Sequence, residues 1–219
     1  MADKKTYSYP GEHATVTWSR PLCIHIGECG RASGELFVGG RQPWCQPDLA
    51  GDDEVEEVVL RCPTGALSVD FADGSRPERA DAVNTVQVAY DGPLFVRGDL
   101  QIDGAPEDVP GLKFRAALCR CGKSKNKPYC DNSHHDAGFR DYGAIGETGD
   151  SDAGSGGTLQ IRAVKNGPLI FSGNVTMRAG AGRKSWQGNK AALCRCGASG
   201  NKPFCDNQHK AIGFKSDDD

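Results

Sequence analysis

The chain has 219 residues and a formal net charge of −3; 37% of its residues are hydrophobic and 29 are glycine. This is the composition of an ordinary globular protein, and no window approaches the roughly 18 uninterrupted apolar residues of a membrane span. The N-terminus has no apolar core of a secretory signal. We therefore expect a cytoplasmic protein in a reducing compartment, where its ten cysteines bind metal more readily than they form disulfides.

Three short elements are predicted in the N-terminal part of the chain. Residues 14–18 alternate as a strand does, and residues 66–71 form a second, closing strand. Residues 52–60 have the amphipathic pattern and acidic first turn of a helix. The acidic residues of that helix are expected to form a solvated face, or a docking site for a basic reductase.

The cysteines of this part have the spacing of a cluster-binding protein. Cys23 and Cys29 are separated by five residues, and Cys62 is followed by proline. Bacterial ferredoxins use a C-x2-C-x2-C run and a distant C-P pair; here Ile26 stands at the middle cysteine position. Together with the Cys-Ile-His, Arg-Gln-Pro-Trp and Cys-Pro-Thr-Gly-Ala-Leu elements, residues 7–72 resemble the divergent mono-cluster ferredoxin domain of the 4Fe-4S type. The resemblance implies that these three cysteines hold one iron–sulfur cluster.

Three thiolates suit a [3Fe–4S] cluster, and the resemblance to three-cysteine ferredoxins favours it. Cys45 as a fourth ligand would give [4Fe–4S], but it follows Trp44 where a buried strand residue is expected, so we interpret it as a structural thiol. His25, close to Cys23, is expected to face away from the cluster. A zinc site is the alternative for the segment.

After a polar stretch at residues 73–81, the chain repeats itself at an offset of 75 residues. Residues 119–139 share 14 of 21 positions with residues 194–214, and a Gly-Pro-Leu tripeptide upstream of each also recurs. Two runs of alternating apolar and polar residues, separated by a Gly-Pro break, precede each of these repeated segments. They predict a β-hairpin in each copy. Because one hairpin is not stable alone, the copies are expected to combine their strands. Residues 141–157 are rich in Gly, Ser and Asp and predict a flexible linker.

Each copy contains the pattern C-x-C-x8-C-x3-H, which provides three thiolates and one imidazole. Its members are Cys119, Cys121, Cys130 and His134 in the first copy, and Cys194, Cys196, Cys205 and His209 in the second. C-x-C brings two thiolates together on an extended turn, and C-x3-H places the other two ligands on the same side of a helix start. Asp131 and Asp206 suit the N-terminus of that helical turn as cap and dipole partner.

Four such ligands are enough for a structural zinc site, but zinc sites usually use C-x2-C knuckles. A catalytic Cys/His pair is the weaker alternative, since it would not need four ligands in two copies. Nucleic-acid binding has no support, because no basic stripe with interleaved aromatic residues is present.

Basic residues flank both patterns and are expected to offset thiolate charge, to attract an acidic partner, or simply to form a solvated rim. They are Arg120, Lys123, Lys125, Lys127, Arg195 and Lys202. His135, whose counterpart is a lysine, is interpreted as a surface residue.

Both copies resemble the CDGSH iron–sulfur proteins, the mitoNEET-like family, whose motif is C-x-C-x2-(S/T)-x3-P-x-C-D-G-(S/A/T)-H. The resemblance implies that each set of three cysteines and one histidine holds a [2Fe–2S] cluster. Ser124 and Ser199 match the family's Ser/Thr position, and the proline is present in both copies.

Both copies depart from the motif at the glycine, which is Asn132 in the first and Asn207 in the second. Asparagine replaces glycine most readily where φ is positive, so the same substitution in both copies predicts a retained backbone shape. Gln208 stands where the motif has a small residue and is expected to crowd the second site.

The predicted fold class is α+β. A bacterial-ferredoxin-like βαββαβ domain is followed by a fused, pseudo-dimeric CDGSH unit with a β-cap and two cluster-binding lobes. The predicted divisions are residues 1–80 for the ferredoxin-like domain, 81–140 and 158–219 for the two CDGSH repeats, and 141–157 for the linker. In the CDGSH family two protomers pair, so we expect this chain to be a monomer with internal pseudo-twofold symmetry.

The predicted function is electron transfer by a multi-cluster iron–sulfur protein that is not itself an enzyme. Its cofactors would be two [2Fe–2S] clusters and one [3Fe–4S] or [4Fe–4S] cluster, and its partner a reductase or another oxidoreductase. The second hypothesis is an iron–sulfur donor to an apo-acceptor, or a redox or iron sensor, because a protonated histidine ligand can release a cluster. The third is a zinc-stabilised interaction module.

Overall fold

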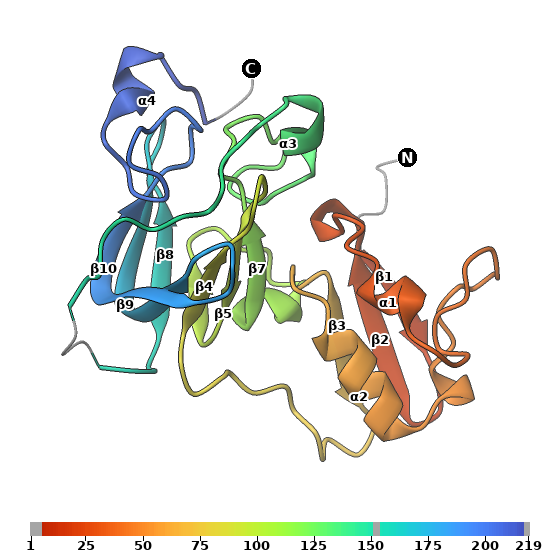
Figure 1. Ribbon diagram of the computed structural model, residues 1–219. Helices are drawn as coiled ribbons and strands as arrows, with labels where there is room; N and C mark the ends of the chain where they lie inside the picture. The colour runs from red at the N-terminus through yellow and green to blue at the C-terminus, as the bar shows by residue number, and fades with distance from the viewer. Residues whose placement is uncertain (1–5, 151–153, 217–219) are drawn as a thin grey trace.

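The computed structural model describes residues 6–150 and 154–216. It is an α+β molecule in which short helices accompany two β-sheets (Figure 1). The smaller sheet belongs to the N-terminal part of the chain, and the larger one is formed by the two repeats. None of the helices in the described part of the chain has the length and apolar character needed to cross a membrane.

The N-terminal sheet has three antiparallel strands in the order β1-β2-β3, which are β1 (Thr6–Pro10), β2 (Ala14–Ser19) and β3 (Leu67–Phe71). Helix α2 (Asp52–Leu60) packs against β3 with Val55, Val58 and Val59 buried. The predicted helix and both predicted strands are therefore present. The short α1 (Glu28–Arg31) and the 3₁₀ turns η1 (Arg20–Leu22) and η2 (Pro47–Leu49) complete this part.

The observed order of elements differs from the predicted βαββαβ. Two strands precede α1, and between α1 and α2 the pairing found among the described residues is a single bridge from Phe37 to Cys45. The sequence of this segment explains the difference, because it contains four glycines and Pro43 and Pro47. Proline cannot donate to a strand ladder, and glycine weakens one.

The larger sheet has seven strands in the order β6-β8-β9-β4-β5-β7, with β10 paired to β9. The strands are β4 (Thr85–Val88), β5 (Leu94–Arg97), β6 (Leu100–Ile102), β7 (Arg115–Leu118), β8 (Leu159–Ala163), β9 (Leu169–Arg178) and β10 (Lys184–Leu193). The 3₁₀ turn η3 (Pro110–Lys113) precedes β7. The antiparallel pairs β4–β5 and β8–β9 are the predicted hairpins.

The two repeats exchange strands within this sheet. Strand β6 of the first repeat runs parallel to β8 of the second, and β4 of the first runs parallel to the end of β9. Apolar side chains from both repeats form one core, which includes Val86, Val96, Leu159 and Phe171. The two halves therefore share one core, because neither hairpin is covered by its own repeat alone.

The stretch between the repeats, predicted to be a flexible linker, is hydrogen-bonded to the sheet in its described part. The amide of Gly180 donates to the carbonyl of Gly143 (2.9 Å), and the amide of Asp150 donates to the carbonyl of Gln187 (2.7 Å). Residues 151–153 of this stretch lie outside the described residues.

Two lobes extend from one end of the large sheet and carry the short helices α3 (Ser133–Asp136) and α4 (Gln208–Ala211) (Figure 1). The lobes touch, because the backbones of Cys121 and Cys196 form an isolated antiparallel bridge. The N-terminal part packs against the first repeat, where β3 contacts η3. The predicted cysteine and histidine ligands of the repeats lie in these lobes.

Candidate functional site

In the first lobe the four predicted ligands form two pairs. The Sγ atoms of Cys119 and Cys121 are 3.8 Å apart, and the Sγ atom of Cys130 lies 3.5 Å from Nδ1 of His134. All four residues are buried. The first pair is at the end of β7 and the second brackets the start of α3, so the sheet and the helix present the pairs separately.

The second lobe repeats this arrangement closely. The Sγ atoms of Cys194 and Cys196 are 3.7 Å apart, and Sγ of Cys205 lies 3.4 Å from Nδ1 of His209. Cys205 is only half-buried, whereas the other three residues are buried. The recurrence of both distances shows that the repeat in sequence is also a repeat in side-chain geometry.

The pairing bears on which metal group the residues can hold. Within residues 6–150 and 154–216, no three His, Cys, Asp or Glu side chains are close enough together to hold a single metal ion. A structural zinc site needs four ligands around one ion. Each lobe presents its donors as a Cys–Cys pair and a Cys–His pair, and each pair could hold one metal atom.

Hydrogen bonds fix the loop that carries the ligands. In the first lobe the carboxylate of Asp131 accepts from the amides of Lys125 (2.8 Å) and Ser133 (3.0 Å). The cap position of α3 is Asn132 and that of α4 is Asn207, so the two aspartates support the turn from one residue before the cap and do not cap it as predicted. The hydroxyl of Ser124 donates to the carbonyl of Tyr129 (2.6 Å). These bonds hold the segment on both sides of Cys130 in one conformation.

The second lobe uses the same bonds. Asp206 accepts from the amides of Gly200 (2.8 Å) and Gln208 (3.0 Å), and Ser199 donates to the carbonyl of Phe204 (2.7 Å). The accepted hydrogen bonds lower the pKa of Asp206, so the carboxylate stays ionised as an acceptor. Gln208, which we expected to crowd the second site, is exposed. That expectation was wrong, because the helix start directs this position toward solvent.

The two asparagines that replace the motif's glycine have positive φ angles, as predicted. Asn132 and Asn207 both have φ of 72° and precede α3 and α4. Their amides donate to the sulfur two residues earlier, Cys130 and Cys205 respectively, at 3.4 Å in each case. The left-handed residue thus turns an amide toward the sulfur.

Two of the basic residues that flank the ligand patterns, Arg120 and Arg195, are buried. Arg120 donates from Nε to the carbonyl of Gly92 (2.9 Å) and from Nη1 to the carboxylate of Asp141, and its guanidinium lies 5.0 Å from the centre of the Phe139 ring. Arg195 donates to the carbonyl of Gly167 (3.1 Å). Only 1% and 3% of these two arginines are exposed.

Of the three alternatives left open for the flanking basic residues, the solvated rim does not apply to these two arginines, whereas Lys123 and Lys125 are exposed. Each arginine lies between the two cysteines of a C-x-C and ties that turn to the hairpin of its own repeat. The signal that could have found them is the joint recurrence of Cys-Arg-Cys and Gly-Pro-Leu at the same offset. Together with burial and His135, the charge of Arg120 lowers the pKa of the nearby His134.

The protonation of the first lobe follows from its geometry. The hydrogen bond between the two sulfurs lowers the pKa of Cys119 to about 6 and raises the pKa of Cys121, because the pair shares one proton. Burial raises the pKa of Cys130 to about 12. Burial lowers the pKa of His134, so its imidazole stays neutral and able to bind a metal.

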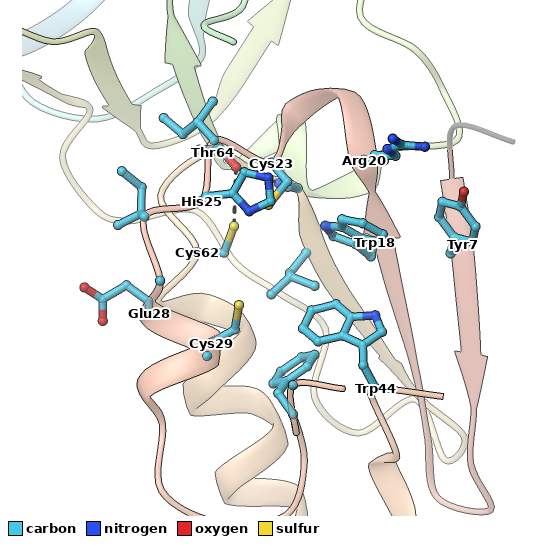
Figure 2. A pocket seen from close by; sticks show the side chains of 18 of the residues that line it. Tyr7, Trp18, Arg20, Cys23, His25, Glu28, Cys29, Trp44, Cys62 and Thr64 are labelled. Carbon is cyan, nitrogen blue, oxygen red and sulfur yellow. Dashed lines mark hydrogen bonds between the residues drawn. The ribbon is translucent and has the colours of Figure 1, made fainter. Parts of the chain in front are cut away.

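The three predicted ligands of the N-terminal part line one cavity of about 630 Å³. Figure 2 shows the sulfur atoms of Cys29 and Cys62 directed into this space, with Cys23 near His25 and the indole rings of Trp18 and Trp44 on the opposite side. Burial and the neighbouring sulfurs raise the pKa of Cys29. Sγ of Cys62 lies 3.4 Å from Oγ1 of Thr64.

Cys45 lies apart from this cavity. Its side chain is 1% exposed, it packs in the core beneath α2, and it lines a separate cavity of about 450 Å³ together with Tyr9 and Pro47. Burial raises its pKa to about 12, so it is a neutral thiol. Its burial agrees with the interpretation of a structural cysteine.

Of the predictions for the two histidines near the ligand sets, the structure confirms one and contradicts the other. His135 is exposed, as predicted for a surface residue. His25 was expected to face away from the N-terminal site, but it lines the cavity with φ of 53° (Figure 2). The left-handed backbone of His25 turns the side chain toward the cavity, and the amino-acid pattern does not signal that conformation.

Two protein families match this chain. The family described as "Iron-binding zinc finger CDGSH type" matches residues 91–135 and again residues 166–210. The family described as "Divergent 4Fe-4S mono-cluster" matches residues 9–70. The matched ranges contain the cysteine and histidine pairs of both lobes and the three cysteines that line the N-terminal cavity.

Individual proteins also match this chain. "Uncharacterized protein YjdI" of Escherichia coli strain K12 is 41% identical over 59 residues, which are 27% of this chain and 78% of YjdI. "CDGSH iron-sulfur domain-containing protein 2 homolog" of Drosophila ananassae is 63% identical over 27 residues, and that of Drosophila erecta is 59% identical over 27. Those 27 residues are 12% of this chain and 20% of each Drosophila protein. No solved structure matches the chain.

The chain is therefore an iron–sulfur protein by class. It belongs to the divergent 4Fe-4S mono-cluster family through its N-terminal part and carries two tandem CDGSH domains after it.

Proposed function

We propose that this chain transfers electrons with three iron–sulfur clusters, two of the [2Fe–2S] type in the lobes and one in the N-terminal cavity. The observation that supports this most strongly is the separation of each lobe's ligands into a Cys–Cys pair and a Cys–His pair. Each pair would hold one iron. The domain limits of 1–80, 81–140, 141–157 and 158–219 are part of this proposal.

The donor sets suit iron–sulfur clusters chemically. The lobes supply thiolates and a neutral imidazole, the ligands that such clusters use, and amides that donate to cysteine sulfur. A [2Fe–2S] cluster bound by three thiolates and one imidazole accepts and returns one electron, at a potential above that of an all-thiolate cluster. The buried Arg120 and Arg195 would balance part of the thiolate charge.

For the N-terminal site we propose Cys23, Cys29 and Cys62 as ligands of a [3Fe–4S] cluster. The support is that these three line one cavity while Cys45 lines another. The alternative is a [4Fe–4S] cluster, for which His25 at the same cavity is a better placed fourth ligand than Cys45.

Iron and sulfide counting with EPR tests this assignment. The anaerobically isolated chain should contain about seven irons if the N-terminal cluster has three, and about eight if it has four. An EPR signal from the oxidised protein supports three irons, because oxidised [2Fe–2S] and [4Fe–4S] clusters give none. Silence of the oxidised protein counts against three irons. Zinc in place of iron and sulfide would overturn the proposal.

The second candidate function is donation of a cluster to an apo-acceptor, or sensing of redox state or iron. The half-buried Cys205 favours it, because a ligand near the surface is easier to exchange. Donation would be favoured if the chain transfers iron and sulfide to an apo-ferredoxin. The variant His209→Cys should then lose this transfer but keep reversible reduction. Reversible one-electron cycling without transfer of iron and sulfide would favour electron transfer as the function.

A further inference from the structure

The two lobes are alike in their ligands but differ in what covers them. In the first lobe Cys130 is 3% exposed and Asn132 is half-buried. At the matching positions of the second lobe Cys205 is half-buried and Asn207 is exposed. The N-terminal domain, which lies on the side of β7, accounts for this difference (Figure 1).

The first contact between this domain and the first lobe is made by Ile24, the residue after the proposed ligand Cys23. Ile24 is 3% exposed and packs against Ala117 and the proposed ligand Cys130. Its carbonyl accepts a hydrogen bond of 2.5 Å from Nδ2 of Asn132. Next to it, Nδ2 of Asn126 donates to the carbonyl of Pro21 (2.8 Å). One residue therefore joins a proposed ligand of the N-terminal site to a proposed ligand of the first lobe.

The second contact is made by Arg115 at the start of β7, whose side chain is fully buried. Its Nη1 donates to the carbonyls of Cys62 (2.7 Å) and Val59 (2.9 Å), and its Nη2 donates to the carbonyl of Leu67 (3.0 Å). Strand β7 leads directly to Cys119. A hydrogen bond and one strand therefore link Cys62 of the N-terminal site to a ligand of the first lobe.

The second repeat has different partners at the matching positions. Lys190, which corresponds to Arg115, is exposed. Asn201, which corresponds to Asn126, donates to the carboxylate of Glu147 (3.0 Å) in the segment between the repeats. The exposed Asn207 corresponds to Asn132. The N-terminal domain is therefore attached to one half of the pseudo-symmetric unit.

The two lobes are also in direct contact with each other. A Cβ atom on Gly122 would lie 2.6 Å from the carbonyl oxygen of Cys196, and one on Gly197 would lie 2.7 Å from that of Cys121. The ligand loops meet backbone to backbone at these two glycines. The contacts thus run in series from the N-terminal site to the first lobe and then to the second.

We propose that this series makes the first CDGSH site an internal relay and the second CDGSH site the outlet to an external one-electron redox protein. The proposal rests on the electron-transfer function proposed above. Tunnelling rates fall steeply with distance, and bonded contacts such as those of Ile24 and Arg115 carry electrons better than gaps do. The half-buried Cys205 and the exposed residues of α4, Gln208 and Lys210, provide the surface for the partner.

The electron balance is simple. A reduced flavoprotein or iron–sulfur protein gives one electron to the N-terminal site and is itself oxidised. That electron then reduces the first lobe's site as the N-terminal site is reoxidised, and next reduces the second lobe's site as the first is reoxidised. Finally the oxidised partner takes it up. No bond is made or broken and no proton is transferred.

The two lobes should lose iron to a chelator at different rates if one is better covered than the other. This is tested by adding an iron chelator to the full-length chain with its clusters bound and recording the visible absorbance over time. The CDGSH absorbance should be lost in two phases, and Cys194→Ser with Cys196→Ser should remove the faster one. Asn132→Gly keeps the positive φ but removes the bond to Ile24, so it should speed the slower phase by about fivefold. The matched control Asn207→Gly should change neither phase.

In the chelation experiment, loss of absorbance in a single phase, or equal effects of the two asparagine variants, would overturn the proposal.

The order of electron transfer is tested by mixing the reduced chain with oxidised cytochrome c and freezing samples for EPR. Cys119→Ser with Cys121→Ser should abolish the fast reoxidation of the N-terminal cluster, and Asn132→Gly, which keeps all ligands, should slow it. Unchanged reoxidation in both contradicts the relay. If the wild-type clusters do not cycle at all, the electron-transfer function itself fails.

Discussion

The asparagines before α3 and α4 show how a single dihedral angle can govern a ligand loop. Both have φ of 72°, and each turns its amide toward a cysteine sulfur. Glycine adopts this angle without strain, asparagine tolerates it, and a β-branched residue does so only with strain. The side chain of Asn207 is exposed, so its replacement tests the backbone angle alone.

We therefore expect Asn207→Gly to be close to neutral and Asn207→Val to destabilise the chain by about 1–2 kcal/mol. The valine variant should also retain less iron in the second lobe, because the amide bond to Cys205 depends on the angle. Thermal unfolding and iron content measure both effects. Equal behaviour of the two variants would contradict the argument.

Cys45 illustrates the opposite situation, a cysteine whose surroundings make it a packing residue. It is 1% exposed, and burial raises its pKa to about 12. Cys130 is buried to a similar degree, but its Sγ lies 3.5 Å from Nδ1 of His134. Cys45 instead lines a different cavity from Cys23, Cys29 and Cys62 and packs there as a small hydrophobic side chain.

Replacing Cys45 with alanine should leave the iron content unchanged and cost about 1 kcal/mol of stability through a small cavity. Cys62 lines the N-terminal cavity together with Cys23 and Cys29, so Cys62→Ala should lose the N-terminal cluster. Iron analysis and urea unfolding distinguish the two. Loss of one iron in Cys45→Ala would make Cys45 a ligand.

At the scale of elements, strand β7 holds the N-terminal domain against the large sheet. Arg115 at its start pairs with Glu78 through Nε (2.8 Å) and Nη2 (2.8 Å), and both side chains are largely shielded from solvent. Burial raises the pKa of Glu78, and the guanidinium opposes that rise. The polar stretch at residues 73–81 therefore packs against β7 at Glu78.

Removing Glu78 would leave a buried guanidinium charge without its carboxylate. We expect Glu78→Ala to lower the free energy of unfolding by about 3–5 kcal/mol. Asp81→Ala is the matched control: Asp81 pairs with Arg97 (3.1 Å) at the surface, and its loss should cost less than about 1 kcal/mol. Denaturant unfolding compares them, and similar losses in both variants would show that the buried pair is unimportant.

At the scale of the whole molecule, the repeats act as one unit because they share strands and touching ligand loops. The parallel pairs β4–β9 and β6–β8 each join the two repeats. Gly122 and Gly197 allow the loops to meet, and both have positive φ angles of 79° and 84°. Gly138 also has positive φ, 59°, but a Cβ there would meet nothing within 4 Å.

This difference separates backbone strain from steric contact. Gly138→Ala should cost only the backbone penalty of about 1–2 kcal/mol. Gly122→Ala should cost a further 1–3 kcal/mol, roughly, because its Cβ meets the backbone of Cys196. Iron content of both lobes should fall in Gly122→Ala alone. Equal melting temperatures in the two variants would show that the lobes do not depend on this contact.

The sequence by itself determined what depends on short stretches of chain. The spacing of C-x-C and C-x3-H predicts two ligand pairs, the pattern of residues 52–60 predicts α2, and the repeated asparagine predicts a positive φ. Such features follow from local geometry, which neighbouring residues set.

Only the tertiary structure decided the rest. It buries Arg120 beneath the ligands, turns His25 into the N-terminal cavity, and attaches the N-terminal domain to the first lobe through Ile24 and Arg115. These contacts join residues up to 108 positions apart. Residues so distant meet only when packing of the whole chain brings them together, and the two nearly identical repeats become unequal for the same reason.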